Sequence, residues 1–339
     1  MTTTREPDSA RAAPPTRALG PRVVDVIFRR REASILLVTL ALFVYFSSVN
    51  SAFFSEANMR VLSHFTYPIA MIALGQVMLL VCGQLDLSAG HVFAFTPFVL
   101  LFFIEAGVPT AIGVVLAVAA ASGVGLLNGL ITVKIGVHPF ITTLGMAFVL
   151  QGSTLIIADG RPTTPPDLGS VESEIFGRFP FVGIMWAVVL TALMYVVLTN
   201  TRWGIYTFAT GGNPLGAREA GVPIDRIKIG NFMMCSALAG FAGTLEGYRI
   251  SSFDPLSGGF TTMFFAISAA VIGGTALAGG SGTIIGGFLG ALFIGVLRDG
   301  FTIEGISSFQ LFIYLGVAII ISMVLNVWLS RLRRGAMLS

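Results

Sequence analysis

The order of apolar and polar residues divides the chain into long hydrophobic stretches joined by short polar connections. Residues 34–54, 182–198 and 309–329 contain no Asp, Glu, Lys or Arg. About 20 apolar residues in a helix span the hydrocarbon of a bilayer, whereas a membrane β-barrel has segments of about 10 residues that alternate between apolar and polar. Because these stretches are apolar throughout, the pattern predicts an all-α fold, a polytopic bundle of transmembrane helices.

The same pattern predicts about ten membrane spans within one domain. Residues 1–33 have the composition of a disordered tail that ends in an amphipathic lead-in, residues 34–330 form the transmembrane domain, and residues 331–339 form a basic tail. The predicted spans lie near residues 34–54, 61–82, 87–105, 109–133, 139–158, 181–200, 228–250, 260–279, 283–300 and 308–330.

The composition agrees with a membrane location. The chain is 55% hydrophobic and 11% charged, with a mean hydropathy of +0.87, whereas an average soluble domain is about 25% charged. The 20 Lys and Arg exceed the 17 Asp and Glu only slightly and are scattered, which argues against a nucleic-acid partner. Cys82 and Cys235 fall within or at the ends of apolar segments and are expected to be small buried hydrophobes, with no disulfide framework.

The basic residues are divided unequally between the two sides of the predicted bundle. With ten spans, one side holds 15 Lys and Arg, including 7 in the N-terminal tail, and the other side holds 5. Because basic loops stay in the cytoplasm, both termini are predicted to be cytoplasmic, in a bacterial inner (cytoplasmic) membrane. Residues 159–180 then form an outer loop where a partner can dock, and residues 201–228 form the longest cytoplasmic loop.

The cytoplasmic loop carries the signals of a short helix of its own. Asn213 has the side chain of an N-cap, Pro214 suits the first helical position, and Gly221 suits the end. These signals predict a helix of two turns that lies outside the hydrocarbon.

A polar segment interrupts the apolar runs near residue 86. Gln84, Asp86 and Ser88 lie between two predicted spans, with glycine on both sides. An acid at this depth marks a transport pathway, a proton relay or a partnered structural site, and irregular backbone is tolerated there only where protein or water surrounds it. The alternative is a plain cytoplasmic turn. In either case Asp86 is expected to cap the third helix.

Polar residues around the fourth and fifth spans extend this candidate pathway. One interpretation places His138 on the wall of the pathway, and the alternative is an interfacial position beside Lys134. Together with Gln84, Asp86 and Ser88, the pathway candidates are Asn128, His138, Phe140 and Thr142.

Small residues recur at intervals of four in several predicted spans. This spacing lets helices approach closely in lipid, and the sequence leaves open whether the helices only pack tightly or also act as hinges. The repeats are Gly282, Gly286 and Gly290, then Ala291 and Gly295, then Ala239, Gly243 and Gly247, then Gly125 and Gly129.

The sequence contains no site for nucleotide-driven work or for covalent chemistry. A P-loop requires G-x-x-x-x-G-K-[ST], and the two lysines, Lys134 and Lys228, are both followed by Ile-Gly. No grouping of nucleophile, base and orienting residue and no metal-ligand spacing is present, so neither an enzyme nor a cofactor or metal site is expected. Glu246 is the clearest acid within a span, three residues before Arg249, a partner on the same helix face.

Five motifs in fixed order resemble the permease subunits of bacterial ATP-binding-cassette importers for ribose, xylose, galactose and related sugars. The resemblance extends from about residue 60 to residue 328. The motifs are Gly83-Gln-Leu-Asp-Leu-Ser-Ala-Gly90, Asn128-Gly-Leu with Pro139-Phe-Ile-Thr-Thr-Leu-Gly145, Asp159-Gly-Arg-Pro162, Gly211-Gly-Asn-Pro-Leu-Gly-Ala-Arg-Glu-Ala-Gly221, and Gly273-Gly-Thr through Gly279-Gly-Ser-Gly-Thr283.

The resemblance implies a permease domain over residues 34–330 that translocates a sugar or polyol. It implies a second permease copy or paralogue, two cytoplasmic ATP-binding subunits and a periplasmic substrate-binding protein as partners. It also implies that the short cytoplasmic helix couples the permease to the ATPase. The coupling residues carried over by this motif are Gly212, Asn213, Ala217, Arg218 and Gly221.

Two differences from the family pattern leave the substrate open. The family usually has Gly-Gly-Ile-Asp-Leu-Ser-Val-Gly-Ser, where this chain has Gln84 and His91 in place of Gly and Ser. One alternative is a permease of the same importer class for branched-chain amino acids or nucleosides, although the Asp86-Leu-Ser element and the loop at Gly212 favour sugars. The other is an ion-coupled secondary transporter, which usually needs acids within the membrane.

Overall fold

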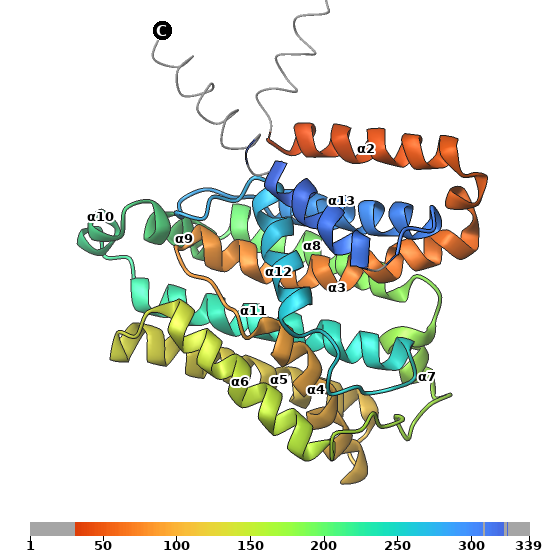
Figure 1. Ribbon diagram of the computed structural model, residues 1–339. Coiled ribbons are helices and arrows are strands. Elements are labelled where there is room, and N and C mark those ends of the chain that lie inside the picture. The colour runs from red at the N-terminus through yellow and green to blue at the C-terminus, as the bar shows by residue number, and fades with distance from the viewer. Residues whose placement is uncertain (1–30, 308, 322–323, 325–339) are drawn as a thin grey trace, which may run out of the picture.

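The apolar stretches form helices because hydrocarbon offers no hydrogen-bond partner to an open backbone. The structure, a computed structural model, describes residues 31–307, 309–321 and 324. Over these residues it is a helical bundle without a β-strand, and an isolated bridge joins Thr163 to Phe253. The all-α prediction is therefore confirmed for the described part of the chain (Figure 1).

The helices follow the predicted spans closely. The long helices are α2 (Arg31–Val49), α3 (Glu56–Val81), α4 (Ala89–Glu105), α5 (Thr110–Leu130), α6 (Pro139–Ile157), α8 (Val182–Asn200), α11 (Ile224–Arg249), α12 (Gly259–Ile272), α13 (Ile284–Ile303) and Phe309–Ile321. The shorter elements are α7 (Val171–Ser173), α9 (Arg202–Gly212), α10 (Pro214–Glu219) and single helical turns at Ser51–Phe54, Ile131–Ile135 and Glu174–Arg178. The segment 1–30 and the basic tail 331–339 lie outside the described residues.

Six of the described helices are long and apolar enough to cross a membrane, so the chain is a multi-pass membrane protein. The predicted eighth span, 260–279, is too long, because α12 ends at Ile272. Two residues later, Gly274 takes the left-handed conformation at φ +94°. At 14 residues α12 is about 21 Å long, short of the roughly 30 Å of hydrocarbon. The count of ten crossings and the cytoplasmic termini remain predictions.

Two helices form the centre of the bundle. In α3, 89% of the residues in the apolar stretch that could span a membrane are buried. In α2, on the periphery, the corresponding share is 17%. The other central helix, α11, packs against α5, α3 and α4, and α13 packs against α3 and α12. Figure 1 shows α2 and α13 along one side of α3, α11 on its other side, and α12 running across the direction of the long helices.

Several of the repeated glycines lie where helices touch backbone to backbone. A Cβ atom added at Gly290 would come within 2.0 Å of the Ala269 carbonyl oxygen of α12, and one at Gly243 within 1.9 Å of the Phe93 carbonyl of α4. One at Gly125 would come within 2.3 Å of the Phe232 carbonyl of α11. Real Cβ atoms do not approach this closely, so these positions require glycine, which accounts for the tight-packing interpretation of the repeats.

The two long loops lie at opposite ends of the bundle. The loop that contains α10 projects from one end, and the loop that contains α7 lies at the other (Figure 1). This arrangement agrees with the sequence prediction that the two loops face opposite sides of the membrane. We refer to the end that carries α10 as the α10 end.

The glycine contacts predict a matched pair of opposite effects. Gly290→Ala should lower the midpoint of thermal unfolding, because the new methyl group collides with the Ala269 carbonyl. Gly145→Ala, at an exposed α6 position with open space around it, should leave the midpoint unchanged or raise it, since alanine favours helix by up to about 1 kcal/mol. Labelling of the buried thiols of Cys82 and Cys235 by a dye during heating in detergent measures both. Equal midpoints for the two variants would contradict the packing assignment.

Candidate functional site

An irregular stretch of backbone lies inside the bundle between α3 and α4. The α3 helix ends at Val81 and is closed by hydrogen bonds from the amides of Gly83 to the Leu80 carbonyl (2.9 Å) and of Gln84 to the Leu79 carbonyl (2.8 Å). Gly83 is left-handed, at φ +75°, and exposed. The chain then turns inward, so that Asp86 and Ser88 are fully buried before α4 begins. We call residues 83–88 the buried segment.

The Asp86 carboxylate organises this segment through neutral donors. One oxygen accepts hydrogen bonds from the Ser88 amide (2.7 Å) and the Ser88 hydroxyl (2.6 Å). The other accepts from the Ser236 hydroxyl of α11 at 3.4 Å. Among the described residues, no basic side chain lies within ion-pair distance of Asp86. The carboxyl group is therefore held by hydroxyl and amide groups alone.

Two helices hold the backbone of the buried segment, and a third holds the Ser88 side chain. The Gln76 amide of α3 donates to the Asp86 carbonyl (2.6 Å) and accepts from the Asp86 amide (3.4 Å). The Thr143 hydroxyl of α6 accepts from the Leu87 amide at 3.0 Å. The Asn128 side chain of α5 donates to the Ser88 hydroxyl at 2.9 Å. Gln76 and Thr143 thus supply hydrogen bonds that a regular helix would make within itself.

These contacts correct two details of the sequence predictions. The turn around Asp86 is not a plain cytoplasmic one, because its residues are enclosed by α3, α5, α6 and α11. Asp86 does not cap the first turn of α4: Ser88 is the N-cap residue, and Asp86 accepts the Ser88 amide just before the helix. Sequence reasoning missed Gln76 and Ser236. The signal for Gln76 was available, since it is a lone amide in an otherwise apolar run of α3.

The structure separates the predicted pathway residues into two sets. Asp86, Ser88 and Asn128 share the network just described. Gln84 is buried beside it but donates only to the adjacent Gly83 carbonyl, at 2.8 Å. Thr142 is buried next to Thr143, and its hydroxyl has no partner among the described residues.

The remaining pair, His138 and Phe140, lies at the exposed start of α6 and shares no hydrogen bond with the Asp86 network among the described residues. His138 caps α6, with its Nδ1 atom accepting the Phe140 amide at 3.3 Å. The Phe140 side chain is 48% exposed.

The helix predicted in the longest loop is present. The Asn213 side chain caps α10 by accepting the Gly216 amide at 3.0 Å, Pro214 is its first residue, and Gly221 ends the turn at φ +79°. Ala217 is buried, whereas Leu215 is 70% exposed on the outer surface. Arg218 lies 4.0 Å from Asp225, which also binds Lys134 at 2.6 Å. The α10 helix thus presents an apolar side chain and a basic side chain outward on a rigid, capped turn.

The base of α10 touches the end of α3 through glycine backbone. Gly211, at the end of α9, lies so close to Val81 that an added Cβ would be 1.8 Å from the Val81 carbonyl oxygen. The same carbonyl accepts the Gly280 amide at 2.8 Å. Gly279 and Gly280 are both left-handed, as a tight turn requires. Two residues separate Val81 from Gln84, so the α9–α10 unit contacts the entry to the buried segment.

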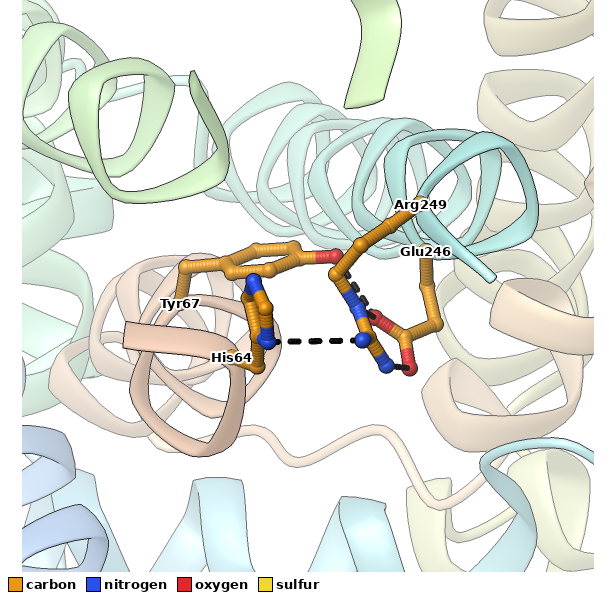
Figure 2. Close-up of polar contacts among 4 residues, drawn as sticks. All are labelled: His64, Tyr67, Glu246 and Arg249. Carbon is orange, nitrogen blue, oxygen red and sulfur yellow. Dashed lines mark hydrogen bonds and ion pairs between the residues drawn. The ribbon is translucent and has the colours of Figure 1, made fainter. Parts of the chain in front are cut away.

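A second polar cluster lies in the half of the bundle away from α10. Glu246, in the last turns of α11, forms an ion pair with Arg249 (2.5 Å) and accepts the Tyr67 hydroxyl of α3 at 2.6 Å. Arg249 also lies 3.4 Å from His64 Nδ1. Figure 2 shows these four side chains converging between α3 and α11. The predicted partnership of Glu246 and Arg249 is therefore present, with two additional members from α3.

The network around Asp86 makes a prediction about stability. Asp86→Leu should lower the free energy of unfolding, because three donors lose their acceptor and each unsatisfied buried group costs about 1–3 kcal/mol. Asp86→Asn keeps one acceptor oxygen and should cost less. Glu105→Leu, at the exposed end of α4, serves as the control. An equal midpoint of thermal unfolding for Asp86→Leu and for the control would contradict the proposed role of the network.

Comparison with known proteins identifies relatives over most of the chain. Residues 59–325 match the family model described as "Branched-chain amino acid transport system / permease component". The chain is 36% identical to the xylose/arabinose import permease XylH of Sulfolobus acidocaldarius, over 90% of this chain and 87% of that protein. It is 33% identical to the ribose import permease RbsC of Escherichia coli K12, over 87% of this chain and 93% of that protein.

A more distant relative extends the same group. The fructose import permease FrcC of Rhizobium meliloti is 27% identical, over 88% of this chain and 85% of that protein. No solved structure matches the chain. With the family model matched from residue 59 to residue 325 and relatives aligned along nearly their full length, the chain belongs to this family of import permeases.

Proposed function

We propose that this chain is the membrane subunit of an ATP-binding-cassette importer and translocates a monosaccharide or polyol. The observation that carries the proposal is that the relatives named above are import permeases for xylose or arabinose, ribose and fructose and align over nearly their whole length. The description of the matching family model names branched-chain amino acids. The uptake experiment described below therefore includes leucine as a candidate substrate.

In this proposal the energy comes from separate subunits. The chain has no P-loop lysine, so ATP hydrolysis belongs to cytoplasmic ATP-binding partners, and a periplasmic binding protein delivers the substrate. A second permease copy or paralogue completes the pathway in the bacterial inner membrane. The exposed apolar surfaces of α5, α6 and α8, with Val115 66%, Ile156 81% and Val189 56% exposed, suit contact with lipid and with this second copy.

Coupling is proposed to pass through α10. An external ATPase that closes on ATP would push on the capped α10 turn, at Gly212, Asn213, Ala217, Arg218 and Gly221. Because Gly211 and Gly280 contact the Val81 carbonyl, a displacement of α10 reaches the end of α3 and the buried segment. Such tightly packed backbone shifts between discrete arrangements and does not deform continuously.

The candidate pathway residues then divide by role. Asp86, Ser88 and Asn128 form a network that holds the buried segment in one arrangement, and Gln84 and Thr142 lie beside it with buried polar atoms that lack a partner among the described residues. His138 and Phe140, at the exposed start of α6, are proposed to face the second permease copy. With ten crossings and both termini in the cytoplasm, α10 faces the ATPase.

Reconstitution tests the proposal. The permease is placed in lipid vesicles with its ATPase and binding protein, and uptake of labelled ribose, xylose, fructose and leucine is measured with and without ATP. Uptake of at least one sugar against its gradient, dependent on ATP and on both partners, is expected. Uptake by the permease alone that collapses with an ion gradient, or transport of leucine and of no sugar, would contradict it.

Charge reversal on α10 tests the coupling assignment. Arg218→Glu should abolish uptake while the protein remains in the membrane, because the side chain is 73% exposed on the surface offered to the ATPase. Arg60→Glu, a reversal at an exposed arginine in the first turns of α3 at the opposite end, should cost at most a surface ion pair with Glu56 and a cation–π contact with Phe181. Vesicle uptake and membrane content are measured for both. Wild-type uptake by Arg218→Glu sinks the assignment.

A further inference from the structure

A cavity that neither the coupling end nor the buried segment uses lies in the half of the bundle away from α10. Its volume is about 280 Å³. It is bounded by side chains of α3, α4, α11, α12 and α13, among them Phe65, Phe93, Glu246, Arg249, Thr261 and Arg298. Figure 2 shows the polar cluster from α3 and α11 that forms part of its wall.

The charged groups of the cavity are partly paired and partly free. Glu246 Oε2 accepts hydrogen bonds from Tyr67 and Arg249, whereas Oε1 accepts only from Arg249 and has additional lone-pair capacity for a hydroxyl donor. Arg298 lies over the Phe65 ring, 4.1 Å from its centroid. No carboxylate among the described residues lies within ion-pair distance of Arg298, so its N–H groups remain available to an oxygen of a ligand.

The rest of the lining is apolar or hydroxylic, apart from the His64 imidazole. Phe65, Phe93 and Phe265 present aromatic surface, and Ser257 and Thr261 add hydroxyl groups. A sugar ring has hydroxyl groups at its rim and C–H groups on its faces. Oriented polar groups set among aromatic walls match this distribution, which is the usual make-up of a small-molecule site.

Two interrupted helices meet at the same place. The α4 helix begins at Ala89 after the buried segment, and α12 begins at Gly259 after the left-handed Gly258. Their first turns touch, since a Cβ on Gly90 would lie 2.0 Å from the Gly259 carbonyl oxygen. Secondary transporters place substrate sites at helix ends that lie within the bilayer. Both the cavity lining and the helix breaks therefore point to one location.

We propose that this cavity is a transit site for one monosaccharide on its way from the binding protein to the cytoplasm. Glu246 accepts hydrogen bonds from sugar hydroxyls, Arg298 donates to sugar oxygens, and Phe65 and Phe93 cover the C–H faces. The site rests on the proposed function and adds to it a location and a capacity of one sugar.

The first test removes the free donor. In vesicles that contain the permease with its ATPase and binding protein, Arg298→Gln should slow sugar uptake by at least about tenfold, the scale of one charged hydrogen bond. The matched control Arg60→Gln, which lies in the first turns of α3 outside the cavity lining, should transport like wild type. Equal uptake by Arg298→Gln and the control would overturn the site, whereas failure of the wild type itself would overturn the proposed function.

The second test detects the sugar in place and does not depend on how Arg298→Gln folds. Ser257→Cys puts a thiol on the wall of the cavity, and the native Cys82 and Cys235 are buried. A polar thiol reagent should label this cysteine, and the transported sugar should slow the labelling. Thr164→Cys, exposed in the loop of α7, should be labelled at one rate with or without sugar.

Protection of Ser257→Cys by the transported sugar is the expected result. No protection by that sugar, while the wild type transports it, would overturn the transit site.

Discussion

A peptide backbone within hydrocarbon must have its polar groups satisfied by the protein, and this constraint is met with most difficulty at residues 83–88. A regular helix satisfies itself. The buried segment does not, so Gln76 and Thr143 supply hydrogen bonds to its backbone from two other helices, while Ser236 and Asn128 hold the Asp86 and Ser88 side chains. The central position of α3 and α11, and the glycines that let their neighbours approach, are what allow short side chains to reach this backbone.

The same segment lies between the proposed coupling end and the proposed sugar site. On one side, the Val81 carbonyl at its entry accepts a hydrogen bond from the Gly280 amide and lies against Gly211 at the base of α10. On the other side, the segment leads directly into α4, whose first turn contacts α12 beside the 280 Å³ cavity. A continuous series of packed backbone contacts therefore joins α10 to the proposed sugar site. These contacts pass through glycines and are too close to absorb a displacement of α10.

Local signals in the sequence predicted much of this architecture. The α10 helix follows from Asn213, Pro214 and Gly221 alone, because a cap is a contact between near neighbours. The break at Asp86 also follows from its own residues. The donors that enclose it were not predictable in the same way, since Ser236 lies 150 residues from Asp86 and only the folded bundle brings them together.

Apolar composition alone also gave the wrong end for α12. Residues 273–279 are apolar enough to extend a predicted span, but Gly274 adopts a conformation that stops the helix. The cavity was likewise beyond reach from sequence, because Phe65, Glu246 and Arg298 are scattered along three helices with no shared motif. Glycine conformation and contacts between distant segments account for most of what the pattern of residues did not predict.

Amide hydrogen exchange across residues 83–88 in the membrane-embedded protein tests the central role of the buried segment most directly. The account predicts that the amides of Asp86, Leu87 and Ser88, which donate to Gln76, Thr143 and Asp86, exchange as slowly as those of α3. Exchange as fast as that of the exposed residues around Thr164 would mean that the segment is an open loop, and would contradict the account.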